Sequence, residues 1–134
     1  MFYYEKSITG KSNSKKIWDL YSNVNKWCVW DKSLKSVHLQ GDFFSGASGI
    51  MEMADNSKLP FLLTECTYEK SFTTQSNLGD ITVSFDHLLS ENNDDTITIT
   101  HTIKIEGKDE CQIENIGKNL SLGVQNCLEN LISL

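Results

Sequence analysis

The sequence predicts an α+β fold in which a curved antiparallel sheet of seven strands wraps around one long C-terminal helix. Between residues 37 and 105, segments typical of strands follow one another at short intervals. After Gly107 the apolar residues recur in steps of three or four, which is the period of a helix. Because sheet and helix each have one apolar face, we expect them to bury these faces against each other.

The first segments predict a strand followed by a helix. Residues 2–9 alternate weakly and are rich in aromatic side chains, as in a strand. After a loop at residues 10–13, Ser14 is the residue we expect to cap the first helix. The apolar residues of this helix stand at helical spacing: Ile17, Leu20 and Tyr21.

Residues 23–25 break the first helix, and residues 24–30 predict a second short one. Trp27 and Trp30 are three positions apart and therefore share a face of that helix. They either pack the helix on the sheet or wall the mouth of a pocket. Two such short helices bury little surface alone, so we expect them to lie against an edge of the sheet.

Six strands joined by short turns should then form a meander. Pro60 starts the third of these, and residues 69–70 make a tight connection. The six predicted strands are residues 37–40, 49–53, 61–68, 72–78, 80–89 and 96–105.

The C-terminal helix is predicted to start at Asp109 and to run for roughly 24 residues, or about 36 Å. Its apolar stripe contains Ile113, Ile116, Leu120, Val124, Cys127 and Leu131. Gly117 and Gly123 lie inside it. They indicate a close approach to the sheet or room left for something else, or they are merely tolerated.

Composition limits the classes of partner. The 134 residues fit a single domain spanning residues 1–134. The net charge is −6, and the 12 Lys and Arg residues are scattered. Such an acidic chain without a basic face is not expected to bind nucleic acid or to insert into a membrane. Oligomeric state is left open between monomer and homodimer.

The cysteines predict free thiols rather than disulfides or a metal site. None of the four forms a C-x-x-C pair or has zinc-ligand spacing with a histidine. The first residues show no basic segment followed by an apolar one, and no apolar run approaches the ~20 residues that span a bilayer. We therefore expect a cytoplasmic protein without a metal or cofactor.

Four segments carry a resemblance to a known superfamily. Residues 17–33 read IWDLYSNVNKWCVWDKS, residues 46–49 GASG, residues 61–65 FLLTE and residues 100–103 THTI. With this order of elements, the chain resembles the START-like, or helix-grip (SRPBCC), superfamily, and within it the polyketide cyclase/dehydrase-like (lipid-transport-like) family. One departure is Glu69-Lys70, where relatives often have a proline. The resemblance implies a mostly apolar cavity between sheet and helix that takes a hydrophobic molecule, with cyclisation or dehydration in a few members.

The last two strands predict a pair of inward histidines. Alternation gives each strand one apolar face, which we expect to point inward. His87 and His101 fall in these faces: Ile81, Val83, Phe85, His87 and Leu89 in one strand, and Ile97, Ile99, His101, Ile103 and Ile105 in the next. Depending on the turn, the two histidines lie diagonally or face to face.

Two imidazoles in an apolar pocket support three interpretations. They orient a polar group of a ligand, they act as general acid and base, or they are hydrogen-bonded core residues without chemistry. Burial should depress their pKa values and favour the neutral form.

Glu65 is the one carboxylate we could propose beside them, and its orientation is ambiguous. It faces inward if Phe61 and Leu63 do, and outward if Leu62 is the inward residue. An exposed Glu65 is the default, and Glu52 poses the same problem.

We thus predict a protein that binds a small hydrophobic or amphipathic ligand, or a lipid, in an internal cavity, through apolar walls and a few polar anchors. The alternatives are a cyclase/dehydratase-type enzyme that uses His87 and His101, and a protein-binding module of the Hsp90-activator-like type. The ligand-binding candidates are Trp30, Glu65, Phe85, His87, Ile99, His101, Ile103, Ile116, Leu120 and Val124.

Overall fold

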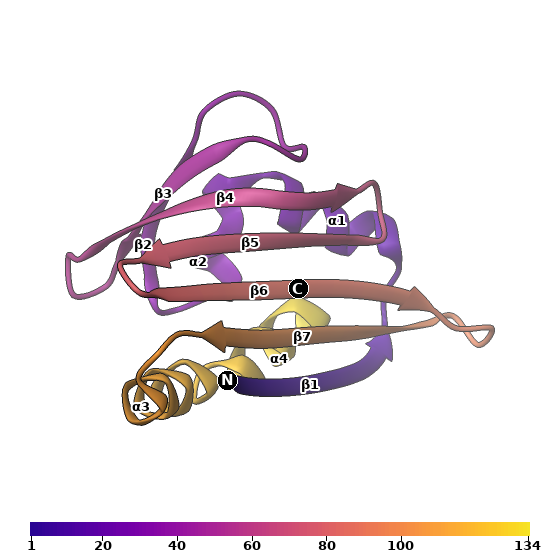
Figure 1. Ribbon diagram of the computed structural model, residues 1–134. Coiled ribbons are helices and arrows are strands. Elements are labelled where there is room, and N and C mark those ends of the chain that lie inside the picture. Colours follow the sequence, from indigo (N-terminus) through magenta and orange to yellow (C-terminus); the bar gives the residue numbers. More distant parts are fainter.

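The computed structural model describes residues 1–134 and contains one antiparallel sheet of seven strands (Figure 1). The strands are β1 (Phe2–Lys11), β2 (Leu34–Leu39), β3 (Ser48–Met53), β4 (Lys58–Thr67), β5 (Ser71–Leu78), β6 (Ile81–Glu91) and β7 (Thr96–Glu106). Their order across the sheet is β1-β7-β6-β5-β4-β3-β2. The predicted meander from β2 to β7 is confirmed, and β1 joins the sheet beside β7.

The short helices after β1 are α1 (Ser14–Ser22), the 3-10 turn η1 (Val24–Lys26) and α2 (Trp27–Trp30). The helix cap is Asn13, so the prediction that Ser14 caps α1 was wrong. Asn13 has an extended backbone, with φ −145°, and its side-chain oxygen accepts a hydrogen bond from the Lys16 amide at 2.9 Å. Ser14 is the buried first residue of the helix.

The C-terminal segment forms two helices, α3 (Glu110–Ser121) and α4 (Val124–Ser133), in place of the one continuous helix predicted. The chain bends at Leu122 and Gly123, although both keep right-handed helical backbone angles. Gly123 has no side chain to cap α4, and glycine is the ordinary residue least suited to a helix interior. The position of this glycine thus explains the bend.

The interior divides into two halves of different composition. An aliphatic half joins β7 to α3 and α4 and contains Ile97, Ile99, Ile105, Ile113, Leu128 and Leu131. An aromatic half joins α1 and α2 to β4 and β5 and contains Trp18, Tyr21, Trp27, Trp30, Phe61 and Phe72. None of the helices combines the length and the apolar character needed to cross a membrane.

Candidate ligand-binding site

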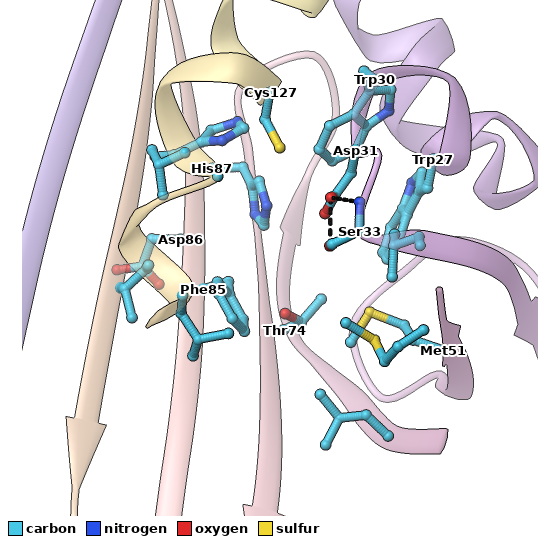
Figure 2. Close-up of a pocket in the computed structure, with 18 of the residues that line it drawn as sticks. Trp27, Trp30, Asp31, Ser33, Met51, Thr74, Phe85, Asp86, His87 and Cys127 are labelled. Carbon is cyan, nitrogen blue, oxygen red and sulfur yellow. Dashed lines mark hydrogen bonds between the residues drawn. The ribbon is translucent and has the colours of Figure 1, made fainter. Parts of the chain in front are cut away.

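A cavity of about 200 Å³ lies between the sheet, α2 and the bend of the C-terminal helices (Figure 2). Eleven of its 20 lining residues are hydrophobic. Ser33, Asn119 and Gly123 line it and are exposed, so they mark its mouth. His87 and His101 line it and are buried, so they mark its inner end. Its walls come from strands and helices far apart in the sequence.

The two histidines lie face to face at this inner end. The register of β6 and β7 pairs His87 directly with His101, and their ring centroids are 4.6 Å apart. Only 8% of His87 and 6% of His101 is exposed. The predicted alternation of both strands is confirmed, and the face-to-face alternative is the one that the structure contains.

Hydrogen bonds fix the orientation of both rings. The Tyr21 hydroxyl lies 2.7 Å from Nε2 of His101. Nδ1 of His87 lies 3.2 Å from the Phe72 carbonyl. Because a carbonyl only accepts, this Nδ1 must carry the proton, which leaves Nε2 of His87 as an acceptor. No protein group hydrogen-bonds to that Nε2, and the ring lies flat against Phe72 at 3.9 Å between centroids.

Burial keeps the two imidazoles and the Tyr21 hydroxyl uncharged at neutral pH. It lowers the pKa of His87 from 6.5 to about 4. Burial, together with the neighbouring His87, lowers the pKa of His101 well below its usual value. Burial also raises the pKa of the Tyr21 hydroxyl well above its usual value. The inner end therefore presents neutral donors and acceptors rather than a charge.

Asp31 supplies a carboxylate on the wall opposite His87, and the two side chains point toward each other (Figure 2). Asp31 follows directly after α2, and its Oδ1 accepts hydrogen bonds from the Ser33 amide at 3.0 Å and the Ser33 hydroxyl at 2.6 Å. Burial and the neighbouring Asp31 raise the pKa of the Cys127 thiol to about 12. This cysteine therefore stays protonated and is a poor nucleophile.

Seven of the ten residues predicted for ligand binding line the cavity: Trp30, Phe85, His87, His101, Ile103, Leu120 and Val124. Ile99 and Ile116 do not. Ile99 is fully buried in the aliphatic half, and Ile116 packs against the core from α3. Trp27 and Trp30 are buried walls rather than parts of the mouth, and their indole N–H groups donate to carbonyls of α1. They therefore serve packing and wall the cavity at once.

Glu65 points away from the cavity, so the outward orientation expected by default is confirmed, and its inclusion among the ligand-binding candidates was wrong. Leu63 pairs with Thr74 but Glu65 pairs with Thr73, which makes Thr64 the extra residue of a bulge. A bulge shifts the side-chain alternation by one. Phe61 and Leu63 therefore face inward while Glu65 faces outward, where it accepts hydrogen bonds from Thr67 and Ser71.

Glu52 does not line the cavity either, because its neighbour Met51 takes the inward position on β3. No group of three or more His, Cys, Asp and Glu side chains is placed to hold a metal ion.

Sequence reasoning missed two polar residues of this region. Tyr21 contacts His101 across 80 positions of sequence, and only the packing of α1 on the sheet brings them together. Asp31 ends the Trp-x-x-Trp-Asp motif, and its place after a helix that carries two inward tryptophans was the signal available. The remaining unpredicted lining comes mainly from β2 to β5: Leu34, Met51, Met53, Leu59 and Thr74.

No protein-family model matches the sequence, and no curated protein sequence matches it significantly. Solved structures do match. A protein from Mesorhizobium loti superposes with a TM-score of 0.80 at 12% identity, over 98% of this chain and 95% of that one. Norcoclaurine synthase from Thalictrum flavum, in complex with dopamine and hydroxybenzaldehyde, gives 0.72 at 11% identity over 98% and 84%. Ara h 8.0201 gives 0.72 at 13% identity over 99% of both chains.

The chain has the helix-grip fold. The predicted resemblance is thereby confirmed at the level of fold. At these identities the likeness does not extend to the ligand or the chemistry. The site must be argued from its own residues.

Proposed function

We propose that the protein binds a small, flat and mostly apolar molecule in the cavity between the sheet and the C-terminal helices. One observation carries the proposal: an apolar cavity contains an unpartnered acceptor, Nε2 of His87, at its inner end. Binding sites typically combine an apolar lining with a few polar groups that orient the ligand. An acceptor without a protein partner is such a group.

The size of the cavity favours a molecule of one ring or two fused rings. A cavity of about 150 Å³ suffices to bind benzene, and pockets for drug-sized ligands start near 300 Å³. At about 200 Å³ this cavity lies between the two. Lipids with long acyl chains are disfavoured on the same ground. The small aromatic molecules in the norcoclaurine synthase complex support the size class.

The protonation states favour a ligand that donates a hydrogen bond. His87 is neutral at pH 7, and its Nδ1–H is used by Phe72. The ligand therefore approaches Nε2 with an O–H or N–H group. A group that only accepts would leave Nε2 desolvated and unpaired, which costs about 1–3 kcal/mol.

Native mass spectrometry of protein purified from its own host tests the proposal directly. We expect a retained molecule that is released on denaturation. Gly123→Leu should lower its occupancy, because nothing lies within 4 Å of a Cβ at this position and the added side chain enters the mouth. Gln125→Leu places a leucine on the exposed part of α4 outside the cavity and is the matched control. Equal loss in both variants, or no retained molecule and no binding of small aromatic probes, would contradict the proposal.

A second candidate is an enzyme, because Tyr21, His101 and His87 form a continuous row of proton-carrying groups. Such a row can donate and remove protons at a bound substrate. His87→Ala and His101→Ala distinguish the candidates in variants shown to fold. Turnover lost with binding retained supports the enzyme, and a graded loss of affinity without any turnover supports the binding protein.

A further inference from the structure

The charges around the cavity are all negative. Asp31 and Asp86 are its charged lining residues, and no lysine or arginine lines it. Asp86 directs its carboxylate away from the cavity, where it pairs with Lys104 at 3.1 Å and accepts a hydrogen bond from Thr73. Asp31 is therefore the one charged side chain that faces the interior of the cavity (Figure 2).

Asp31 has no cationic partner within the protein. The salt bridges of the chain involve Glu110, Asp86 and Glu114 and leave Asp31 out. Its hydrogen bonds come from the neutral groups of Ser33, and the protonated thiol of Cys127 lies beside it. A half-buried carboxylate without a counter-charge interacts strongly with a cation, because the local dielectric is lower than that of water.

The opposite wall reinforces this preference. Nε2 of His87 is an acceptor, and the imidazoles carry no positive charge that would attract an anion. The nearby indole N–H groups are already used, since Trp27 donates to Tyr21 and Trp30 donates to Leu20. A ligand carboxylate would find no positive charge at the inner end and would be repelled by Asp31. An ammonium group would find acceptors on both sides.

We propose that the ligand is a small aromatic amine, whose ammonium group pairs with Asp31 and donates to His87 while its ring lies against Trp30 and Phe85. The inference rests on the proposed function and names its ligand class. Trp30 adds to the preference, since the face of an indole ring attracts a cation. Neutral alcohols of the same shape are weaker ligands, and carboxylates are excluded.

Three probes that share a phenylethyl group and differ in their polar group test the inference: phenethylamine, phenethyl alcohol and phenylpropionate. Isothermal titration calorimetry with the whole chain, at neutral pH and low salt, measures their affinities. We expect the amine to bind about tenfold more tightly than the alcohol, as for a hydrogen bond between charged groups. The carboxylate should show no binding. Asp31→Asn should weaken the amine to the level of the alcohol and leave the alcohol unchanged.

The variant keeps the oxygen that accepts from Ser33, so the local turn should persist, and thermal unfolding checks that it does. Asp19→Asn removes the same charge from the exposed face of α1 and should leave all three affinities unchanged. If the alcohol binds as well as the amine, or Asp31→Asn preserves the tenfold ratio, the amine inference is wrong while binding in the cavity stands. If none of the three probes binds the unchanged protein, the amine inference is wrong, and the retained molecule sought by native mass spectrometry decides the binding function separately.

Discussion

Two glycines in the C-terminal helices have opposite surroundings. A Cβ atom added to Gly117 on α3 would lie 2.3 Å from the ring of Phe2. A Cβ atom added to Gly123, at the bend, would meet nothing within 4 Å. The sequence allowed a close approach to the sheet or room left for something else. The structure contains both, one at each glycine.

The two glycines mark two regions of the interior, the aliphatic half and the cavity. In the aliphatic half, α3 and α4 press against β1 and β7, and the large side chains are fully buried. On the other side of α4, the interior keeps a cavity and buries His87, His101 and the hydroxyl of Tyr21. Packing stabilises a fold, whereas an internal space and buried polar groups cost stability. We therefore assign stability mainly to the aliphatic half and ligand binding to the cavity.

The largest expected effect compares two leucines. Leu128 is 0% exposed, and Leu128→Ala should lower the free energy of unfolding by about 2–5 kcal/mol, because it leaves a void in a packed region. Leu120 lines the cavity, so Leu120→Ala enlarges an existing space and should cost about 1 kcal/mol. Urea denaturation at neutral pH measures both. Equal losses would mean that the cavity wall is packed as tightly as the aliphatic half.

Acid should lower the free energy of unfolding, because the two histidines at the inner end of the cavity are buried in the neutral form. The pKa of His87 is about 4 in the folded chain and 6.5 when the side chain is exposed. Between pH 4 and 6.5, the unfolded chain therefore binds a proton at His87 that the folded chain does not bind. Protonation of His87 does not affect the free energy of unfolding above pH 6.5. As the pH falls from 6.5 toward 4, the free energy of unfolding should fall by about 3 kcal/mol. His101 acts in the same direction.

Urea denaturation repeated at several pH values tests this expectation. His87→Phe keeps a flat ring against Phe72 and cannot be protonated. Its stability should therefore fall less steeply than that of the unchanged protein between pH 6.5 and 4. Parallel curves for the two proteins would show that the pKa of His87 is the same in the folded and the unfolded chain.

The confirmed predictions about the sheet rest on the local periodicity of apolar residues. The alternation along β6 and β7 runs without interruption, so the pattern of apolar residues alone is enough to place His87 and His101 inward. Glu65 shows the limit of the same argument. One bulge at Thr64 reverses the alternation, and a bulge depends on how β4 pairs with β5 and the loop before β3, which no local pattern contains.

The cavity itself could be predicted only in part, because its shape depends on how elements pack. Ile99 and Ile103 share one face of β7, yet only Ile103 lines the cavity, whereas Ile99 is fully buried in the aliphatic half. Asp31 and Tyr21 reach the site through the placement of α1 and α2 on the sheet. Gly123, which lines the mouth, could be seen in the sequence, but the bend of the helix at this residue was not predicted.

Gly117→Ala should destabilise the protein by about 1–3 kcal/mol, as overpacking of a close contact does. The ring of Phe2 has to move, and with it the start of β1. Urea denaturation of this variant beside Phe2→Leu checks the cause. If the close approach is responsible, the double variant should recover part of the loss, because leucine leaves more room beside the new methyl group. A double variant whose losses simply add would show that the contact is not what makes Gly117 necessary.

Gly123→Ala should have the smallest effect on stability and is the most informative variant. The free energy of unfolding and the affinity for ligand should change in opposite directions. The backbone at Gly123 has φ −91°, which alanine adopts without strain, and its methyl group meets no neighbour. Alanine favours a helix over glycine by up to about 1 kcal/mol, so the free energy of unfolding should rise. The same methyl group narrows the mouth, so affinity for a small aromatic probe should fall by a few-fold. Gain of stability with loss of binding is expected where a residue is kept for function at a cost to the fold. A variant that is more stable and binds equally well would show that Gly123 lies at the rim without limiting entry, and the space beside it would need another explanation.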